Sequence, residues 1–277
     1  MTKTVYFDTN VFDHIHKGIG ITKADLLALR SALGAGKISI LLSYLNLEEA
    51  LSALDSCPAL AKAELQLILD LADWKRMVKP ANMLLSGDIN CYARGEVPSQ
   101  PFISDPAIQS NLRAMLDPSR QDMGELLTIA KESRKQKEEF MAGMRQATKK
   151  VLPHAKKLKG QRLTFHEYCE RLADKLAESF AERVEVRDAC QKRGIKGLLE
   201  IRSIRLAVGA NLSLTYAQAF EGRTPKFSDS RDICHAVLAS AASVFVTQDG
   251  AFARLLDRIP IEGFRVVDIC ELLKEIR

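Results

Sequence analysis

The sequence predicts an α/β protein with a doubly wound parallel sheet that is interrupted by an all-helical insertion. Three observations predict this fold class. Short β-rich runs alternate with helical stretches over roughly the first 90 residues, the alternation returns after about residue 225, and the segment between has helical periodicity with little strand character. Alternating strands and helices are typical of a parallel sheet that has helices on both faces.

The N-terminal part contains three predicted strands, Val5–Phe7, Ile38–Leu42 and a shorter one at Arg76–Val78. The helices expected between them cover Val11–Lys17, the stretch from a Thr22 N-cap to Leu33, Leu47–Leu54 and Ala59–Ala72. Threonine is a favoured N-cap residue, and glycines at positions 34 and 36 are suited to ending the second helix.

The pattern changes near residue 95, where Pro98, Pro101 and Pro106 indicate a connector. Helical periodicity then covers Ala107–Met115, Met123–Leu152, Thr164–Lys192, Leu198–Val208 and Leu214–Phe220. Long stretches rich in Lys, Glu, Ala and Leu predict helices that form a lobe of their own. We therefore predict a discontinuous α/β domain over residues 1–94 and 222–277, with a helical insertion over residues 95–221.

The C-terminal part resumes the alternation of helix and strand. Its predicted elements are a helix at Asp232–Ser240, a strand at Val244–Thr247, a helix at Phe252–Asp257 and a strand at Arg265–Val267. These strands would complete the sheet begun by the N-terminal part.

The composition is that of a globular protein, with 277 residues of which 47% are hydrophobic and 27% charged. No apolar run approaches the length of a membrane span, and the N-terminus leads into a strand, so we expect a cytoplasmic protein. The six cysteines are scattered without a Cys-x-x-Cys pair, which argues against a zinc site or a disulfide framework. Phosphate-binding glycine motifs are absent from the sequence, so nucleotide binding has no motif to support it.

Positive charge is concentrated in one segment. Between Lys131 and Arg162 eleven Lys or Arg residues face three Glu, a net charge of +8, whereas the whole chain carries +5. A basic segment of this kind suits a polyanionic partner such as RNA. The alternative is a solvated helix face whose charges keep the protein soluble.

Four acidic residues stand near the ends of predicted strands or at the start of a helix. They are Asp8, Glu49, Asp232 and Asp249. Because the carboxyl ends of parallel strands meet at one edge of the sheet, we expect these side chains to lie close together. Clustered carboxylates repel one another, and a hard divalent cation such as Mg²⁺ or Mn²⁺ relieves that repulsion.

The order of motifs around these acids resembles that of PIN-domain nucleases. The matching segments are Val5-Tyr6-Phe7-Asp8-Thr9-Asn10, Asn46-Leu47-Glu48-Glu49, Asp232-Ile233-Cys234-His235-Ala236 and Val246-Thr247-Gln248-Asp249-Gly250-Ala251-Phe252. The resemblance covers roughly residues 1–90 and 225–277 and leaves the middle of the chain unexplained.

The resemblance implies a role for each acid. Asp8, Glu49, Asp232 and Asp249 would be the catalytic residues and the ligands of one or two Mg²⁺ or Mn²⁺ ions. Glu48 competes with its neighbour Glu49 for the second position. The supporting residues would be Asn10 and Thr247, together with Asp229, which could assist or replace Asp232. The remaining candidate on the same helix, His235, is expected to be a core or surface histidine.

The function implied by the resemblance is metal-dependent hydrolysis of RNA phosphodiester bonds by an endoribonuclease. Such an enzyme would be either toxin-like, restrained by a small inhibitory protein partner as in toxin–antitoxin pairs, or an RNA-processing nuclease. A non-catalytic PIN-like scaffold that binds RNA or protein is the alternative. The helical insertion could grip RNA, bind a partner or form a homo-oligomer. Only the resemblance favours RNA over DNA.

Overall fold

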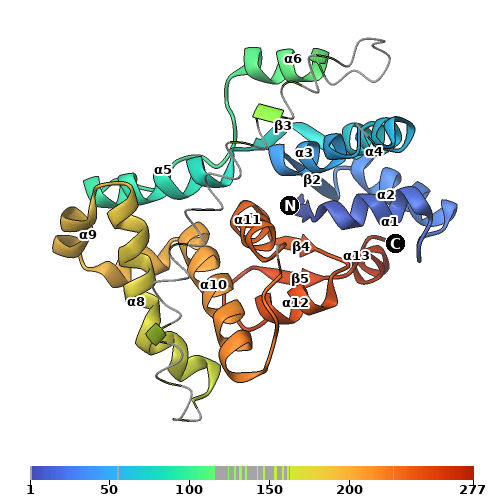
Figure 1. The fold of residues 1–277 in the computed structure, drawn as a ribbon. Coiled ribbons are helices and arrows are strands. Elements are labelled where there is room, and N and C mark those ends of the chain that lie inside the picture. Colours follow the sequence, from blue (N-terminus) through green and yellow to red (C-terminus); the bar gives the residue numbers. More distant parts are fainter. Residues whose placement is uncertain are drawn as a thin grey trace.

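A computed structural model describes residues 2–54, 56–115, 163–226 and 228–277, together with scattered positions between 116 and 162. The described residues form a sheet of five strands in the order β3-β2-β1-β4-β5. All strand pairs are parallel. The strands are β1 (Lys3–Phe7), β2 (Ile38–Ser43), β3 (Ala72–Val78), β4 (Val244–Val246) and β5 (Arg265–Val267). The fold is therefore α/β with a parallel sheet, as predicted (Figure 1).

Strand β1 lies at the centre of the sheet, where Val5 is aligned with Ile40 of β2 and with Val244 of β4. Along the chain, β2 and β3 are added on one side of β1, whereas β4 and β5 are added on the other. The strand order thus reverses between β1 and β4. In open α/β sheets, the crevice at the carboxyl ends of the strands on either side of such a switch point is where ligands bind.

One face of the sheet is covered by helices from both ends of the chain. These are α1 (Thr9–Lys17), α2 (Lys23–Gly34), α4 (Pro58–Leu71) and α13 (Ile269–Ile276). Val5 and Phe7 of β1 belong to this core, as do Ile40 and Leu42 of β2. Alternate residues along a strand point to opposite faces, so one strand contributes to two cores.

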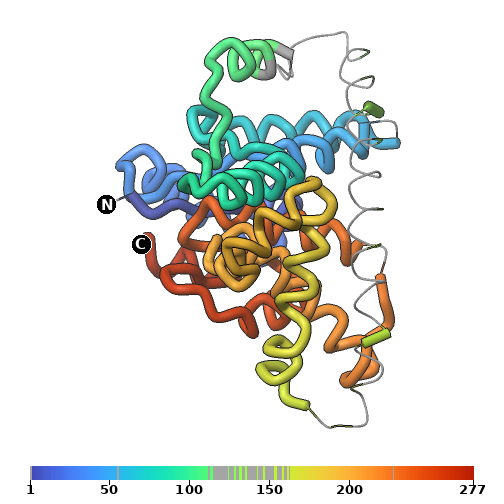
Figure 2. The backbone as a smooth tube through the Cα atoms, turned by 90° about the vertical axis from the view of Figure 1, so that its left-hand side faces the viewer, coloured from blue at the N-terminus to red at the C-terminus, as the bar shows by residue number. Residues whose placement is uncertain are grey.

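The opposite face receives Tyr6 of β1, Leu41 of β2 and Phe245 of β4. The helices that cover it include α5 (Ala81–Arg94), α8 (Phe165–Arg183), α10 (Arg202–Phe220) and α11 (Asp229–Ala239). Figure 2 shows the yellow α8 alongside the orange α10. Burial on both faces explains why β2 consists entirely of buried residues.

The remaining described elements connect these layers. They are α3 (Tyr44–Ser52), α6 (Pro106–Met115), α9 (Arg187–Arg193), a 3₁₀ helix at Ile195–Glu200 and α12 (Gly250–Leu256). Several helix starts are fixed by capping boxes. In α2, for example, the Thr22 hydroxyl accepts from the Asp25 backbone amide, and the Asp25 carboxylate accepts from the Thr22 amide.

The predicted strands are all present, and β1, β2 and β5 agree closely with the expected ranges. The prediction of two helices over Leu198–Val208 and Leu214–Phe220 was wrong, because a single helix, α10, runs through Asn211 and Ser213. Both polar side chains are buried and bonded to backbone carbonyls, at distances of 2.8 and 2.9 Å. The predicted helix Met123–Leu152 and most of the basic segment Lys131–Arg162 lie outside the described residues.

The helices α8 and α10 do not stand apart from the sheet. Tyr168 of α8 and Leu206 of α10 belong to the same hydrophobic core as Tyr6 and Phe245. The boundaries of the helical insertion at residues 95–221 remain a prediction, but these two helices contribute to the core that covers one face of the sheet. None of the described helices has the length and apolar character required to cross a membrane.

Candidate active site

Asp8 lies at the switch point of the sheet. It follows β1 directly and begins α1 as its N-cap. Its backbone amide donates to the carbonyl of Val246 at 2.9 Å, which ties the end of β1 to the end of β4. The residue is only 8% exposed. Burial raises the pKa of Asp8 above its ordinary value, although the His235 charge and the Thr247 hydrogen bond act in the opposite direction.

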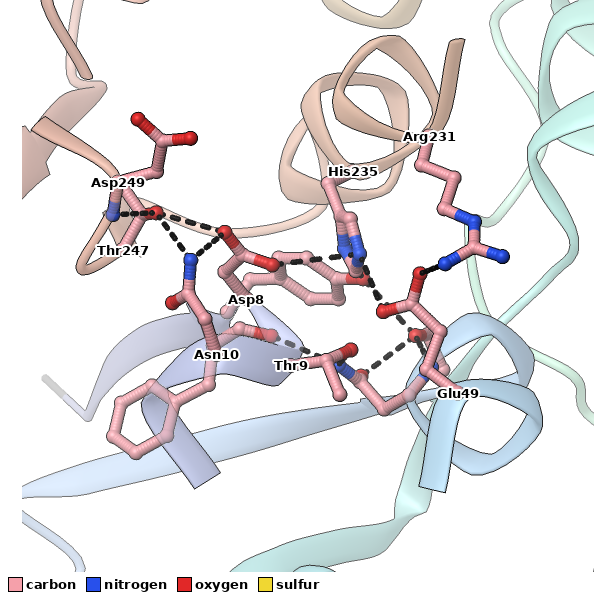
Figure 3. Close-up of polar contacts among 12 residues, drawn as sticks. Asp8, Thr9, Asn10, Glu49, Arg231, His235, Thr247 and Asp249 are labelled. Carbon is pink, nitrogen blue, oxygen red and sulfur yellow. Dashed lines mark hydrogen bonds and ion pairs between the residues drawn. The ribbon is translucent and has the colours of Figure 1, made fainter. Parts of the chain in front are cut away.

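Two donors hold the Asp8 carboxylate in place. Its Oδ2 accepts from Asn10 Nδ2 at 2.8 Å and from the Thr247 hydroxyl at 2.7 Å (Figure 3). The Asn10 amide is itself oriented, because its Oδ1 accepts from the backbone amide of Gln248 at 3.0 Å. Asn10 and Thr247, predicted as supporting residues, therefore both contact Asp8.

Asp249 follows β4 and caps the short helix α12. Its Oδ1 accepts from the backbone amides of Ala251 and Phe252 at 2.8 and 2.9 Å. Its own amide donates to Thr247 Oγ1 at 3.1 Å, so the residue is tied to the same network as Asp8. In Figure 3 its carboxylate is turned away from Asp8. The structure thus gives Asp249 a capping role at the edge of the cluster.

Asp232 lies within the first turn of α11, where Ser228 is the N-cap residue. Burial raises the pKa of Asp232 to about 7, and the charges of Asp8, Asp249 and Asp229 act in the same direction. The imidazole of His235 opposes this shift. Asp232 is thus near enough to Asp8 and Asp249 for their charges to interact, which places the three aspartates in one electrostatic cluster.

Glu49 on α3 is linked to Asp8 through a histidine. His235 Nε2 lies 3.2 Å from Glu49 Oε2 and 3.5 Å from Asp8 Oδ1. Arg231 approaches the other side of Glu49, with 3.7 Å between its guanidinium and Oε1. The neighbouring Glu48 instead lines a cavity of about 530 Å³ between α3, α5 and α11. Glu49 thus contacts the cluster around Asp8 through His235.

Asp229 has a different environment from the other acids. Its carboxylate accepts hydrogen bonds from both terminal nitrogens of Arg223, at 2.8 and 2.6 Å, and from the Lys226 backbone amide at 2.9 Å. A bidentate arginine pair of this kind is a strong charge-assisted contact. These contacts fasten the start of α11 to the preceding loop, so Asp229 has a structural role whether or not it assists Asp232.

The position of His235 among the acids was not predicted. A core or surface histidine was expected, and at 3% exposure His235 is a core residue, but it also lies between two predicted site carboxylates. Its other ring nitrogen, Nδ1, lies 2.9 Å from the Tyr6 hydroxyl. Its spacing of three residues from Asp232 is the one sequence feature that could have indicated this, because such residues share a helix face.

The oxygen atoms of these carboxylates suit a hard divalent cation in chemistry. In the part of the chain that the structure describes, however, no group of three or more His, Cys, Asp or Glu side chains is arranged so that it could hold a metal ion as it stands. Binding therefore requires the side chains to adjust around the ion. A cation would relieve the repulsion from Asp8, Asp249 and Asp229, which adds to the larger effect of burial in raising the pKa of Asp232.

Comparison with known proteins adds no further assignment. The chain matches no protein-family model, no curated protein and no solved structure. The ordered motifs and the geometry of this site are therefore the basis for assigning a function.

Proposed function

We propose that the protein is a metal-dependent endoribonuclease of the PIN-like type. Asp8, Glu49, Asp232 and Asp249 would hold one or two Mg²⁺ or Mn²⁺ ions, with Asn10 and Thr247 orienting Asp8. The observation that carries this proposal is the position of Asp8. A buried carboxylate, fixed by two donors, lies at the switch point of a parallel sheet with the other acids around it.

The chemistry follows from what such a site does to water and phosphate. A bound divalent cation supplies a water molecule of lowered pKa and neutralises charge that develops on the phosphate. The protein's part is to hold the carboxylates rigidly, and the hydrogen bonds from Asn10 and Thr247 do this for Asp8. No covalent step on a side chain is required for this hydrolysis.

The experiment that tests this proposal is a cleavage assay on labelled single-stranded RNA and DNA, with Mn²⁺, Mg²⁺ or EDTA. Asp8→Asn is compared with Asp70→Asn, whose side chain is 42% exposed on α4. Cleavage by the wild type and by Asp70→Asn, but not by Asp8→Asn or in EDTA, is the expected result. Equal cleavage by both variants would show that the activity does not use Asp8.

The second candidate is a scaffold that binds RNA or protein without cleaving it. Two observations favour it: the described side chains do not form a ready metal-binding group, and Glu49 already contacts both Arg231 and His235. If folded protein binds RNA with the same affinity in Mn²⁺ and in EDTA and leaves it intact, the scaffold is the better account. An inhibitory protein partner and a homo-oligomer remain compatible with either candidate.

A further inference from the structure

A chain of buried hydrogen bonds leads from Asn46 through Ser43 and Tyr6 to His235. Asn46 Nδ2 donates to the carbonyl of Phe7 at 3.0 Å and to Thr9 Oγ1 at 3.2 Å. A backbone carbonyl can only accept, so this contact fixes the orientation of the amide. Asn46 Oδ1 is therefore an acceptor, and the Ser43 hydroxyl donates its single proton to it at 2.7 Å.

The next link is Tyr6, whose hydroxyl oxygen lies 3.0 Å from Ser43 Oγ. Because the Ser43 proton is already used toward Asn46, the Tyr6 hydroxyl must donate to Ser43. A tyrosine hydroxyl ordinarily keeps its proton at neutral pH. The single proton of the Tyr6 hydroxyl therefore points to Ser43 and not to His235.

The Tyr6 oxygen can then only accept from the histidine ring, which it contacts at 2.9 Å. The proton of a neutral His235 ring consequently lies on Nδ1. Its other nitrogen, Nε2, carries a lone pair and faces Glu49 Oε2 at 3.2 Å and Asp8 Oδ1 at 3.5 Å. In this tautomer a nitrogen lone pair and two carboxylate oxygens face one another.

Three such electron-pair donors repel one another unless a cation lies between them, either a proton on Nε2, which makes the ring an imidazolium, or a metal ion. The side chains would still adjust to surround a metal ion, because the described residues form no group of three that holds one as it stands. Neighbouring ligand atoms on one ion at roughly 2.1 Å stand about 3 Å apart, close to the two distances from Nε2. Histidines that bind metals commonly donate their other ring N–H to a fixed acceptor, which sets the tautomer and the ring orientation. The Tyr6 oxygen is such an acceptor because its own proton is donated to Ser43, and its position is fixed because the side chain is fully buried in the core.

We infer that His235 is a nitrogen ligand of the metal centre, binding through Nε2 beside Asp8 and Glu49, with Tyr6 as the residue that positions it. This inference rests on the proposed function for the presence of a divalent ion, and it changes the ligand set from carboxylates alone to a mixed set. Mg²⁺ prefers oxygen ligands, whereas divalent first-row transition metals accept imidazole nitrogen, with Mn²⁺ the weakest binder among them. The site should therefore discriminate between Mn²⁺ and Mg²⁺.

The test is Mn²⁺ binding to the full chain, followed by electron paramagnetic resonance. The signal of free Mn²⁺ gives the affinity, and electron spin-echo modulation detects nitrogen bound to the ion. We expect nitrogen coupling in the wild type, its loss in His235→Gln, and its retention in His166→Gln, whose side chain is 82% exposed. The His235→Gln change should weaken Mn²⁺ binding by about 10-fold or more and Mg²⁺ binding much less.

A second pair of variants covers the case in which the buried His235→Gln chain does not fold. Tyr6→Phe removes only the hydroxyl that receives the Nδ1 proton and should weaken Mn²⁺ binding by about 10-fold. Its control is Tyr216→Phe on α10, which loses a 2.9 Å hydrogen bond to the Leu163 carbonyl and should leave the Mn²⁺ affinity unchanged.

The outcomes separate the two proposals. Tight Mn²⁺ binding without nitrogen coupling in the wild type would overturn the role of His235, which would then be a hydrogen-bond donor to Asp8 and Glu49, while leaving the carboxylate site intact. Failure of the folded wild type to bind Mn²⁺ at all would overturn both the ligand assignment and the metal-dependent nuclease.

Discussion

The hydroxyl of Thr247 donates to Asp8 Oδ2 at 2.7 Å and so joins two residues that are 239 positions apart in the chain. Both residues follow strands, β1 and β4, at the point where the strand order reverses. The bond fixes the most buried of the four candidate acids relative to the neighbouring strand.

Thr247→Val keeps the shape of the side chain but removes this donor. We expect a loss of about 1–2 kcal/mol in the free energy of unfolding, because a buried carboxylate oxygen loses one of its partners. The pKa of Asp8 should rise further, since the Thr247 hydrogen bond lowers it. Denaturant unfolding measures the first effect, and weaker Mn²⁺ binding at neutral pH would report the second.

Thr4→Val is the matched control for this change. Thr4 lies at the other end of β1, where its Oγ1 only accepts a 3.2 Å contact from the Ser243 amide. The Ser243 amide also donates to the Thr4 carbonyl, so Thr4→Val should change the free energy of unfolding little. Equal effects of the two substitutions on Mn²⁺ binding would contradict a specific role of Thr247.

Asp232→Asn should stabilise the metal-free protein at alkaline pH. The folded-state pKa is about 7 against an ordinary value of 3.8, so between these values the unfolded chain has lost the proton that the folded chain retains. The free energy of unfolding of the wild type therefore falls as pH rises through this window. The loss of stability from ionising the buried Asp232 carboxyl is complete above about pH 7. Asparagine does not ionise, so the Asp232→Asn variant does not lose this stability.

The expected gain is on the order of 2 kcal/mol at pH 8, because partial exposure of the Asp232 side chain reduces the full effect of the shift. The two proteins should be equally stable near pH 3. Thermal unfolding across this pH range in EDTA measures the difference, and saturating Mn²⁺ should reduce or reverse it. A constant difference at all pH values would exclude titration of Asp232 as its cause.

Asp229→Asn should weaken the fold without weakening metal binding. The change breaks the bidentate pair with Arg223 and leaves the guanidinium without its carboxylate. We expect a loss of about 1–3 kcal/mol in unfolding free energy. The Mn²⁺ affinity of the folded variant, measured by calorimetry, should stay within about 2-fold of the wild type. A drop comparable to that in Asp8→Asn would instead make Asp229 a ligand.

Gly209→Ala tests the packing of α10 against the C-terminal part of the chain. A Cβ at Gly209 would lie 2.7 Å from Ile259 Cγ2, so the buried contact must shift. We expect destabilisation of about 1–3 kcal/mol. Gly34→Ala is the control, because nothing lies within 4 Å of a Cβ there, and it should be neutral or stabilising. Equal unfolding midpoints for the two variants would show that α10 accommodates the methyl group.

Much of the fold could be predicted because buried strands have a plain sequence pattern. The apolar runs of β1 and β2 end in polar residues, and both were identified. Helix α5 was missed, because it contains Gly87, a poor helix former, in its middle. Its stability comes from packing against α10 and α11, and tertiary packing of this kind is not visible in local propensity.

The acids of the candidate site could be predicted because parallel strands bring their carboxyl ends to one edge. The partners of those acids could not. The contact of His235 with Glu49 spans 186 residues, and the contact with Tyr6 spans 229, so both depend on how α11 sits over the sheet. The Arg223–Asp229 pair depends on the path of the loop before α11, which the sequence does not specify.

The central strand of the sheet comes from the start of the chain, whereas one of its two neighbours, β4, begins at Val244. During synthesis the ribosome therefore releases β1, β2 and β3 long before the partner that completes the switch point. Asp8 cannot receive its Thr247 hydrogen bond, nor meet Asp249, until that late segment has emerged. A nascent chain thus carries half of the site for most of its translation, so any activity of this site should appear only at the end of synthesis.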